Sequence, residues 1–224
     1  MKKSFWITLA FSLGYLVLAL ASLVLWGTSH PWQRVDIFSG GYLVLRFLGS
    51  IHSLVSSRLV FNSKPVMREW WALESDQPAP RMVVLLMLAD LAVLFDYGHW
   101  QLVAKLQQPL LQSLGLALYA AVAVWQMWTD AYLARYFSQQ HSEAVPMDHG
   151  PYRYVRHPRY SAGIVAKVAF ALALASILGW VLVGAWAILL LRKITVEEAH
   201  LKNVFGSRYE AYSRRTARVL PGIY

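Results

Sequence analysis

Residues 160–196 read YSAGIVAKVAFALALASILGWVLVGAWAILLLRKITV, an almost unbroken apolar stretch. A helix rises about 1.5 Å per residue and a bilayer core is about 30 Å thick, so the stretch is too long for one crossing. Ser176-Ile177-Leu178-Gly179-Trp180 provides a turn, because glycine breaks a helix and tryptophan suits a membrane interface. The stretch therefore predicts a helical hairpin with spans at 160–177 and 178–196.

The rest of the chain has the same apolar character. Hydrophobic residues make up 57% of the 224 residues and charged residues only 15%, which is unlike a soluble globular protein. An all-α, polytopic transmembrane bundle of about five to six spans follows, and the apolar run after Met1 contains no small-residue cleavage site, so it predicts an uncleaved first span. The four further predicted spans are roughly 4–26, 38–61, 82–97, which is short, and 110–137.

Basic residues are distributed unevenly between the ends of these spans. With the N-terminus inside, 17 of the 21 Lys and Arg residues lie on one side, and only Arg34 and Lys105 lie on the other. The positive-inside rule then predicts an integral, multi-pass membrane protein with both termini on the cytoplasmic side. This arrangement explains the net charge of +9 without a nucleic-acid partner. Because the chain has no cysteine, disulfides, thiolate catalysis and Cys-ligated metals are excluded.

Two cations fall inside predicted spans, where an unpaired charge is costly. We expect Arg46 to pair with Asp90, which lies at comparable depth, and Lys167 to extend its amine to the cytoplasmic interface. Small residues from Gly49 to Ser57 share one face of the second span and predict close helix packing. His52 and His99 fit structural or interfacial roles. No group of residues has the spacing of a metal site, so none is predicted.

The loop before the hairpin, residues 149–163, reads HGPYRYVRHPRYSAG. Pro151 and Pro158 forbid a continuous helix and give the loop a defined shape. Its cations can donate to a carboxylate or phosphate, and its tyrosines offer flat apolar faces. This mixture suits an adenosine-containing ligand. A connector that lies on anionic lipid headgroups is the alternative.

Glu197 and Glu198 follow the last predicted span on the same helix. Adjacent residues on a helix do not share a face, so one carboxylate can enter a pocket while the other meets solvent or a basic partner. A carboxylate at the membrane surface suits a ligand's ammonium or sulfonium group. A charged helix end that is simply solvated is the alternative.

The segment Gly150–Gly163 resembles the G-x-Y-x-x-x-R-H-P-x-Y-x-G signature of the isoprenylcysteine carboxyl methyltransferase and phospholipid methyltransferase superfamily. A second block resembles the same superfamily: Glu197-Glu198-x-x-Leu201-x-x-x-Phe205-Gly206-x-x-Tyr209-x-x-Tyr212. Arg218-Val219-Leu220-Pro221 resembles its basic, proline-marked ending. The resemblance covers roughly residues 137–224, and residues 1–136 show no family motif.

The resemblance implies an integral-membrane methyltransferase that uses S-adenosyl-L-methionine at the cytoplasmic face. Residues 1–136 would then be N-terminal transmembrane helices (about four spans), and residues 137–224 the catalytic region with the loop, the hairpin and an amphipathic tail. The implied cofactor-binding residues are Ala144, Val145, Pro146, Met147, Tyr152, His157, Pro158, Arg159, Tyr160 and Glu197. The family's prenylcysteine enzymes place an arginine four residues before the first glutamate, where this sequence has Lys193. The candidate catalytic cations are Lys193, Arg192 and Arg156.

The lipid-like acceptor implied by the resemblance is a prenylated cysteine or a phospholipid. Carboxyl O-methylation of an isoprenylcysteine is our leading expectation, because a carboxylate is already ionised and needs no general base. Amine N-methylation of a phospholipid is the alternative. Sterol reductases, which use a nicotinamide cofactor, resemble the same C-terminal architecture, and a non-enzymatic transporter or scaffold is a further possibility.

Overall fold

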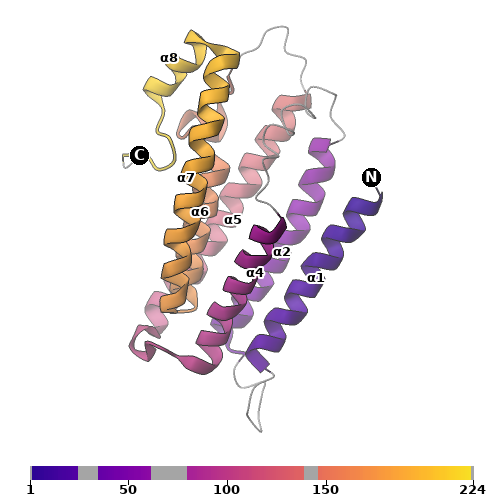
Figure 1. The fold of residues 1–224 in the computed structure, drawn as a ribbon, viewed down its shortest axis with the longest axis vertical. Helices are drawn as coiled ribbons and strands as arrows, with labels where there is room; N and C mark the ends of the chain where they lie inside the picture. Colours follow the sequence, from indigo (N-terminus) through magenta and orange to yellow (C-terminus); the bar gives the residue numbers. More distant parts are fainter. Residues whose placement is uncertain (1, 25–34, 62–79, 139–145, 223–224) are drawn as a thin grey trace. The chain divides into compact units, whose positions relative to one another are not determined.

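The computed structural model describes residues 2–24, 35–61, 80–138 and 146–222 (Figure 1). These ranges contain no β-strand, and one isolated β-bridge joins Val155 and Ala217. The all-α fold class is therefore confirmed. The α-helices are α1 (Lys2–Val24), α2 (Ile37–Phe61), α4 (Pro80–Phe95), α5 (Pro109–Ser138), α6 (Pro158–Ala173), α7 (Ile177–Phe205) and α8 (Ser207–Arg215), with short helical turns at Asp96–Trp100, Ala104–Leu106 and Gly150–Arg153.

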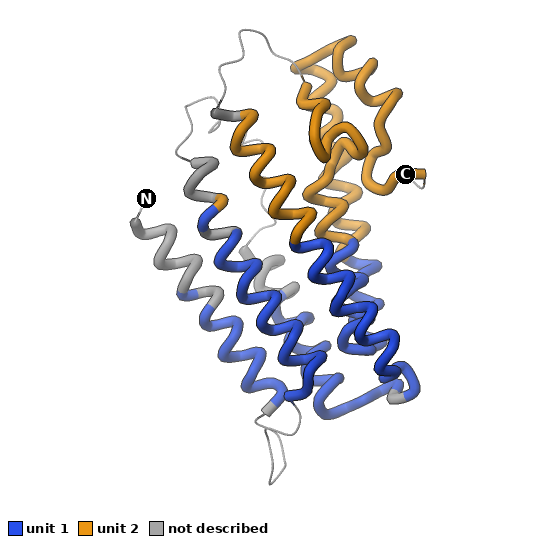
Figure 2. Tube along the Cα trace, turned by 180° about the vertical axis from the view of Figure 1, so that it is seen from behind, with its two compact units in different colours: residues 1–55, 77–123, 165–185 blue, residues 56–76, 124–164, 186–224 orange. Residues whose placement is uncertain are grey.

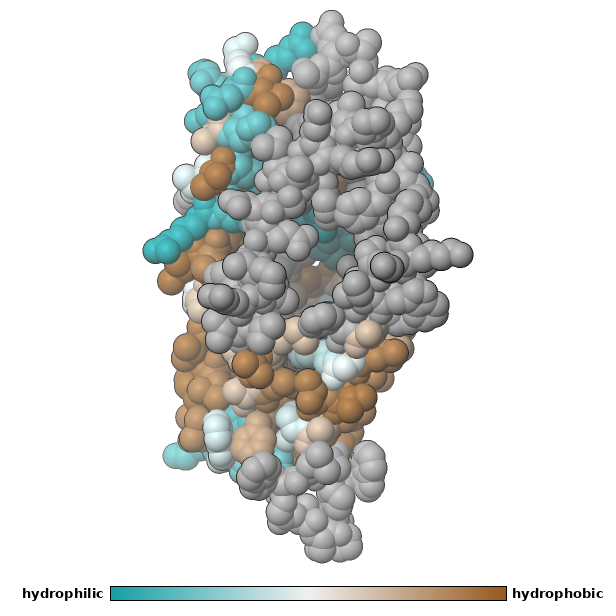
Figure 3. Space-filling model, turned by 45° about the vertical axis from the view of Figure 1, so that its right-hand side comes forward, coloured by the Kyte–Doolittle hydropathy of each residue, from teal (hydrophilic) through white to brown (hydrophobic). Residues whose placement is uncertain are grey.

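Each of the six predicted apolar segments contains one of the helices α1, α2, α4, α5, α6 and α7 or most of it. Two helical stretches in the described part, Pro109–Tyr136 and Ile177–Phe205, are long and apolar enough to cross a membrane. Only 11% and 17% of their most apolar windows is buried, whereas the core helix of a soluble protein would be mostly covered. Hydrophobic residues gather on the exposed surface seen in Figure 3. These two helices fit contact with lipid, and the total of five to six spans stays a prediction.

The hairpin turn comprises residues 174–176, so it begins two residues before the predicted turn at 176–180. α6 ends at Ala173 and α7 begins at Ile177, with Ala175 in the left-handed region at φ 45°. The hydroxyl of Ser176 donates to Asp96 Oδ2 at 2.5 Å and fixes the turn. Gly179 lies inside α7, where a Cβ would come within 2.9 Å of Ala171 on α6. The prediction of a turn at 176–180 was wrong because this glycine serves close helix packing and breaks no helix.

Two compact units make up the chain, each assembled from interleaved segments (Figure 2). The first contains residues 1–55, 77–123 and 165–185, and the second contains residues 56–76, 124–164 and 186–224. Because both units draw on both halves of the sequence, the domain boundary at residue 136 stays a prediction. The apolar core of the first unit includes Tyr15, Leu23, Tyr42, Leu94, Phe170 and Leu174.

A close helix approach in the first unit occurs at Gly115 of α5. A Cβ on Gly115 would lie 2.3 Å from the backbone nitrogen of Ala173 on α6. A Cβ on Gly49, in the small-residue face of α2, would meet no atom within 4 Å. Close packing therefore occurs at Gly115, and the packing prediction was wrong at Gly49.

The buried charges of the first unit pair differently from the prediction. Asp90 binds Lys167, with 2.5 Å between Oδ1 and Nζ. Arg46 donates to Ser50 Oγ at 3.4 Å and lies over the Tyr15 ring, 5.3 Å from its centroid. Two predictions were wrong: the Arg46–Asp90 ion pair and the extension of the Lys167 amine to the interface. The reason is that the buried Asp90 carboxylate on α4 binds the Lys167 amine from α6. Asp90 still attracts Arg46 electrostatically.

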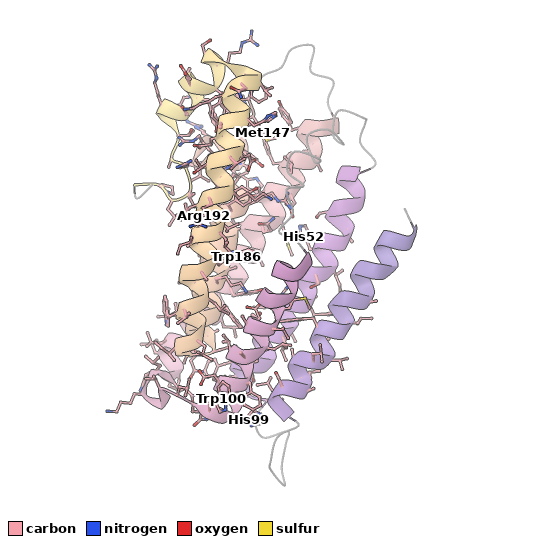
Figure 4. The ribbon with its side chains drawn as sticks, in the orientation of Figure 1. His52, His99, Trp100, Met147, Trp186 and Arg192 are labelled. Atoms are coloured by element: carbon pink, nitrogen blue, oxygen red, sulfur yellow. The ribbon has the colours of Figure 1, made fainter. Side chains whose placement is uncertain are left out.

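The structural role expected of His99 is confirmed. Its Nε2 lies 2.9 Å from the Ser22 carbonyl oxygen, and its ring stacks on Phe95 at 4.4 Å. His99 and His52 are both marked in Figure 4.

Candidate functional site

The loop of residues 149–163, which contains Arg156-His157-Pro158, lies in the second unit. It has the defined shape that its prolines predicted. Gly150 adopts φ +58°, and a Cβ there would lie 2.6 Å from the Tyr132 ring, so only glycine fits. Pro158 opens α6, a position that tolerates proline because the first turn of a helix needs no amide donor.

The chain's tail holds the end of this loop. The Arg156 amide donates to the Ala217 carbonyl at 2.8 Å, and the His157 amide donates to the Arg218 carbonyl at 3.2 Å. The hydroxyl of Ser161 donates to the Val219 carbonyl at 2.5 Å. Residues 217–219 therefore fix the direction in which the loop enters α6.

Arg156 joins the loop to α7 and α8. Its Nε lies 2.8 Å from Glu198 Oε1, and its Nη1 donates to the carbonyls of Ser213 (2.7 Å) and Thr216 (2.5 Å) at the end of α8. The second oxygen of Glu198 lies 2.9 Å from Arg218 Nε. The Arg156 and Glu198 side chains are only 13% and 12% exposed. Arg156, a candidate catalytic residue, thus binds three groups of the protein itself.

His157 lies between the two glutamates. It is 5% exposed, and its Nε2 is 3.3 Å from Glu198 Oε1 while its Nδ1 is 3.8 Å from Glu197 Oε2. The ring also stacks on Tyr160, with centroids 5.6 Å apart. Glu197 Oε2 is buried and, within the described part of the chain, accepts no hydrogen bond. Glu198 therefore meets basic partners, as expected for one of the two glutamates, and Glu197 has a buried oxygen beside the imidazole.

Lys193 lies one helical turn before Glu197 on the same side of α7. Its Nζ is 5.7 Å from the centroid of the Tyr160 ring. Arg192, marked on α7 in Figure 4, is exposed. Because residues four apart share a helix face, Lys193 accompanies Glu197 and Arg192 does not.

α5 contributes contacts that the sequence did not predict. Asp130 Oδ1 lies 3.3 Å from Arg159 Nε, and Trp125 Nε1 donates to the Pro158 carbonyl at 3.1 Å. Asp130 is buried, which is unusual for a carboxylate in an apolar helix. That single acidic residue was the available signal for this contact. Arg159, a predicted cofactor residue, is therefore engaged by α5.

Two tyrosines of α8 pack beneath the loop. The hydroxyl of Tyr212 donates to the Tyr152 carbonyl at 2.7 Å, and Tyr209 lies edge-on to Tyr212. Burial raises the pKa of both hydroxyls well above the ordinary value, and the charge of Glu198 adds to this effect at Tyr209. Both are therefore neutral at physiological pH.

A hollow of about 790 Å³ lies beside the start of the loop. Pro146 and Met147, two of the predicted cofactor residues, line it, and Met147 is marked in Figure 4. Ala144 and Val145 fall outside the described residues. Sequence reasoning missed the rest of the lining: Tyr132, Arg135, Tyr136, Asp148, His149, Arg208, Ala211 and Arg215.

Comparison with known families gives one match in this part of the chain. Residues 110–208 match the family model described as "Phospholipid methyltransferase". The matched region runs from α5 through the loop, α6 and α7 to the first turn of α8. It therefore includes α5, where the sequence alone showed no motif. Comparison with curated proteins gives no match.

Proposed function

We propose that the chain belongs to the family whose model, described as "Phospholipid methyltransferase", matches residues 110–208. On this premise, we propose that the protein is a membrane-embedded methyltransferase that uses S-adenosyl-L-methionine and acts on a lipidic acceptor. One observation carries the proposal: the buried Glu197 oxygen beside His157, which accepts no hydrogen bond from any residue that the structure describes. A buried acceptor of this kind is costly unless a ligand donates to it.

The chemistry of these residues fits the proposed cofactor. S-adenosyl-L-methionine, when bound, supplies a methyl group activated as a sulfonium. Glu197 offers a carboxylate for the cofactor's cationic groups, and the stacked His157 and Tyr160 offer flat ring faces. The full proposed contact set is Tyr152, His157, Pro158, Arg159, Tyr160 and Glu197, together with the preceding segment Ala144, Val145, Pro146 and Met147.

For the acceptor, we propose a carboxylate on a lipid, as in isoprenylcysteine. Lys193 shares a helix face with Glu197, so its ammonium lies on the side where the cofactor would bind. An ionised carboxylate needs no general base, and correct alignment alone can lower the barrier by about 7–11 kcal/mol. Lys193, with Arg192 beside it in the sequence, is therefore the proposed contact for the acceptor's charge.

Phospholipid amine N-methylation is the second candidate, and the description of the matched family favours it. An amine must lose its proton before it attacks. Tyr209 and Tyr212 are unsuited to accept that proton, because their raised pKa values keep both hydroxyls protonated at physiological pH. His157 is then the group at this site that suits a base.

The placement in the cell also remains part of the proposal. The asymmetry of the basic residues supports a multi-pass protein whose termini and active site face the cytoplasm. The lipid chain of the acceptor would enter sideways between helices, while the cofactor would enter from the aqueous side.

The test is methyl transfer from radiolabelled S-adenosyl-L-methionine by the purified chain. Prenylcysteine analogues and aminophospholipids would be offered in separate reactions. We expect label in the carboxyl ester, and Lys193→Ala should raise the KM for this acceptor. S-adenosylhomocysteine should still raise the melting temperature of the Lys193→Ala variant.

Other results would redirect the assignment. Label in the lipid amine alone would select the second candidate. Stabilisation by NADPH with no effect of S-adenosylhomocysteine would indicate a reductase and overturn the proposal. A transporter or scaffold would show neither effect and would tolerate Glu197→Gln.

A further inference from the structure

Arg46 is a cation in the apolar part of α2. Among the described residues it donates to Ser50 Oγ at 3.4 Å, lies over the Tyr15 ring and forms no ion pair. Asp90 attracts it electrostatically, but this carboxylate binds Lys167. A guanidinium has five N–H donors, and a charge in an apolar span is costly without a counter-charge. Arg46 is therefore suited to bind an anion from outside the chain.

The hydroxyl of Tyr15, on α1, is a second donor at this position. Tyr15 is 6% exposed, and within the described part of the chain its hydroxyl forms no hydrogen bond. Tyr42 is close to it, but the two hydroxyls do not meet in hydrogen-bond geometry. A buried hydroxyl that donates to nothing is costly. One anion could accept from both the Tyr15 hydroxyl and the Arg46 guanidinium.

The face of α2 that carries Arg46 has room for a ligand. Gly49 is three residues after Arg46 and shares its face, and a Cβ on Gly49 would meet no atom within 4 Å. Arg46 itself is half-buried, so this face is open on one side. Leu18, three residues after Tyr15 on α1, is apolar and exposed. An acyl chain can therefore lie against the two helices while its polar end meets Arg46.

The depth of Arg46 indicates the kind of anion. Arg46 is nine residues after the first residue of α2, Ile37, which is about 14 Å along a helix, and a hydrocarbon core is about 30 Å thick. A phosphate stays ionised and remains at the depth of the lipid head groups, whereas a carboxylic acid can enter hydrocarbon in its neutral form. We propose that Arg46 and Tyr15 bind the carboxylate of a free fatty acid. The acid gives its proton to water as the carboxylate binds.

This site is separate from the proposed methyl transfer. Arg46 and Tyr15 belong to the first compact unit, whereas His157, Lys193 and Glu197 belong to the second. A planar carboxylate matches the two parallel donors of a guanidinium, and its free lone pairs can accept from the Tyr15 hydroxyl. Because the ligand would join α1 to α2, bound fatty acid should stabilise the first unit.

The test uses the full chain purified in detergent and counts bound oleic acid by native mass spectrometry. Tyr15→Phe keeps the ring and removes one hydrogen bond to a charged group, so it should weaken retention about tenfold. Arg46→Met removes a bidentate contact and should weaken retention about 100-fold. Methyl oleate, which has the same chain and no charge, should not be retained. Equal retention of the acid and its ester would refute the proposal, because the acyl chain alone would then bind.

Melting temperatures separate binding from folding. Without fatty acid, Tyr15→Phe should melt as the unmodified chain does, because the hydroxyl has no hydrogen-bond partner among the described residues. Oleic acid should raise the melting temperature of the unmodified chain and leave that of Arg46→Met unchanged. Unchanged retention in a folded Tyr15→Phe or Arg46→Met variant would contradict the site. Stronger retention of lysophosphatidic acid than of oleic acid would also overturn it, because the ligand would then be a phosphate.

A control at the proposed acceptor contact distinguishes the two sites. Lys193→Ala should retain oleic acid as the unmodified chain does, and S-adenosylhomocysteine should bind Arg46→Met normally. If Lys193→Ala lost oleic acid and Arg46→Met kept it, the carboxylate would belong to the acceptor contact and the separate site would be refuted. Absence of methyl transfer to every acceptor would overturn the proposed function, whereas oleic acid retention that depends on Arg46 would still support this site.

Discussion

Replacing Glu198 by glutamine should destabilise the protein strongly. The carboxylate binds Arg156 on one oxygen at 2.8 Å and Arg218 on the other at 2.9 Å. The three side chains are 12–18% exposed, so the guanidinium groups would lose their counter-charge in a mostly buried setting. Removing one partner of such a pair costs about 3–5 kcal/mol, and partial solvent access favours the lower figure of about 3 kcal/mol.

Glu197→Gln is the matched control, since it makes the same chemical change one residue earlier. Glu197 Oε2 accepts no hydrogen bond in the described structure, and it lies 3.8 Å from His157 Nδ1. We expect a loss of unfolding free energy below about 1 kcal/mol, because no close pair is broken. Binding of S-adenosylhomocysteine should fall instead, because the proposed ligand contact is weakened.

The assay is thermal unfolding of both variants in the same detergent, with and without S-adenosylhomocysteine. For a chain of this size, about 3 kcal/mol corresponds to roughly 6–12 °C, so Glu198→Gln should melt lower by that amount. It should keep a ligand-induced rise in melting temperature, while Glu197→Gln should lose most of it. Equal melting temperatures for the two variants would refute the division of roles between the glutamates.

Three further experiments test the fold. Lys167→Met should lower the free energy of unfolding by about 3–5 kcal/mol, because it leaves the Asp90 carboxylate buried without its partner. Lys167→Met combined with Asp90→Asn should recover most of this free energy. An equal loss in the double variant would contradict the pairing. Gly115→Val should cost at least about 2 kcal/mol because a Cβ would overlap the Ala173 backbone, whereas Gly184→Ala, in open space, should be neutral or stabilising by chemical denaturation. Tyr212→Phe should cost about 1 kcal/mol by removing a 2.7 Å hydrogen bond, and an unchanged melting temperature would show that this bond does not hold α8.

The helices α1, α2, α4, α5, α6 and α7 were predictable from the sequence because each contains a long apolar run, and such runs depend only on local composition. The hairpin turn was not, because Gly179 has two possible uses. Sequence shows that glycine permits a turn, but only the tertiary structure shows that Ala171 of the neighbouring helix needs the space. The partner of Asp90 was missed for a related reason: depth along straight helices does not show which helices are neighbours.

The loop was predictable as a shaped segment, but the division of labour among its cations was not. In the sequence, Arg156, Arg159 and Lys193 are equivalent donors. The fold assigns Arg156 to Glu198 and the end of α8, and Arg159 to Asp130. Lys193 is the cation on the Glu197 side of α7. The roles follow from chain segments that are distant in sequence, so no motif of the loop alone could distinguish them.

This assignment separates two effects that loop substitutions would otherwise confuse. Arg156→Gln should lower stability and reduce methyl transfer in proportion to the folded fraction, since its contacts lie within the protein. Lys193→Gln should leave the melting temperature nearly unchanged. It should raise the KM for a charged acceptor more than for a neutral one, because a cation attracts an anionic group and has little effect on a neutral one. Comparing a carboxylate acceptor with its neutral methyl ester as a competitor measures this dependence. If Arg156→Gln, rather than Lys193→Gln, removed the preference for the charged acceptor at unchanged stability, Arg156 would be the substrate contact and its contacts with α8 would be secondary.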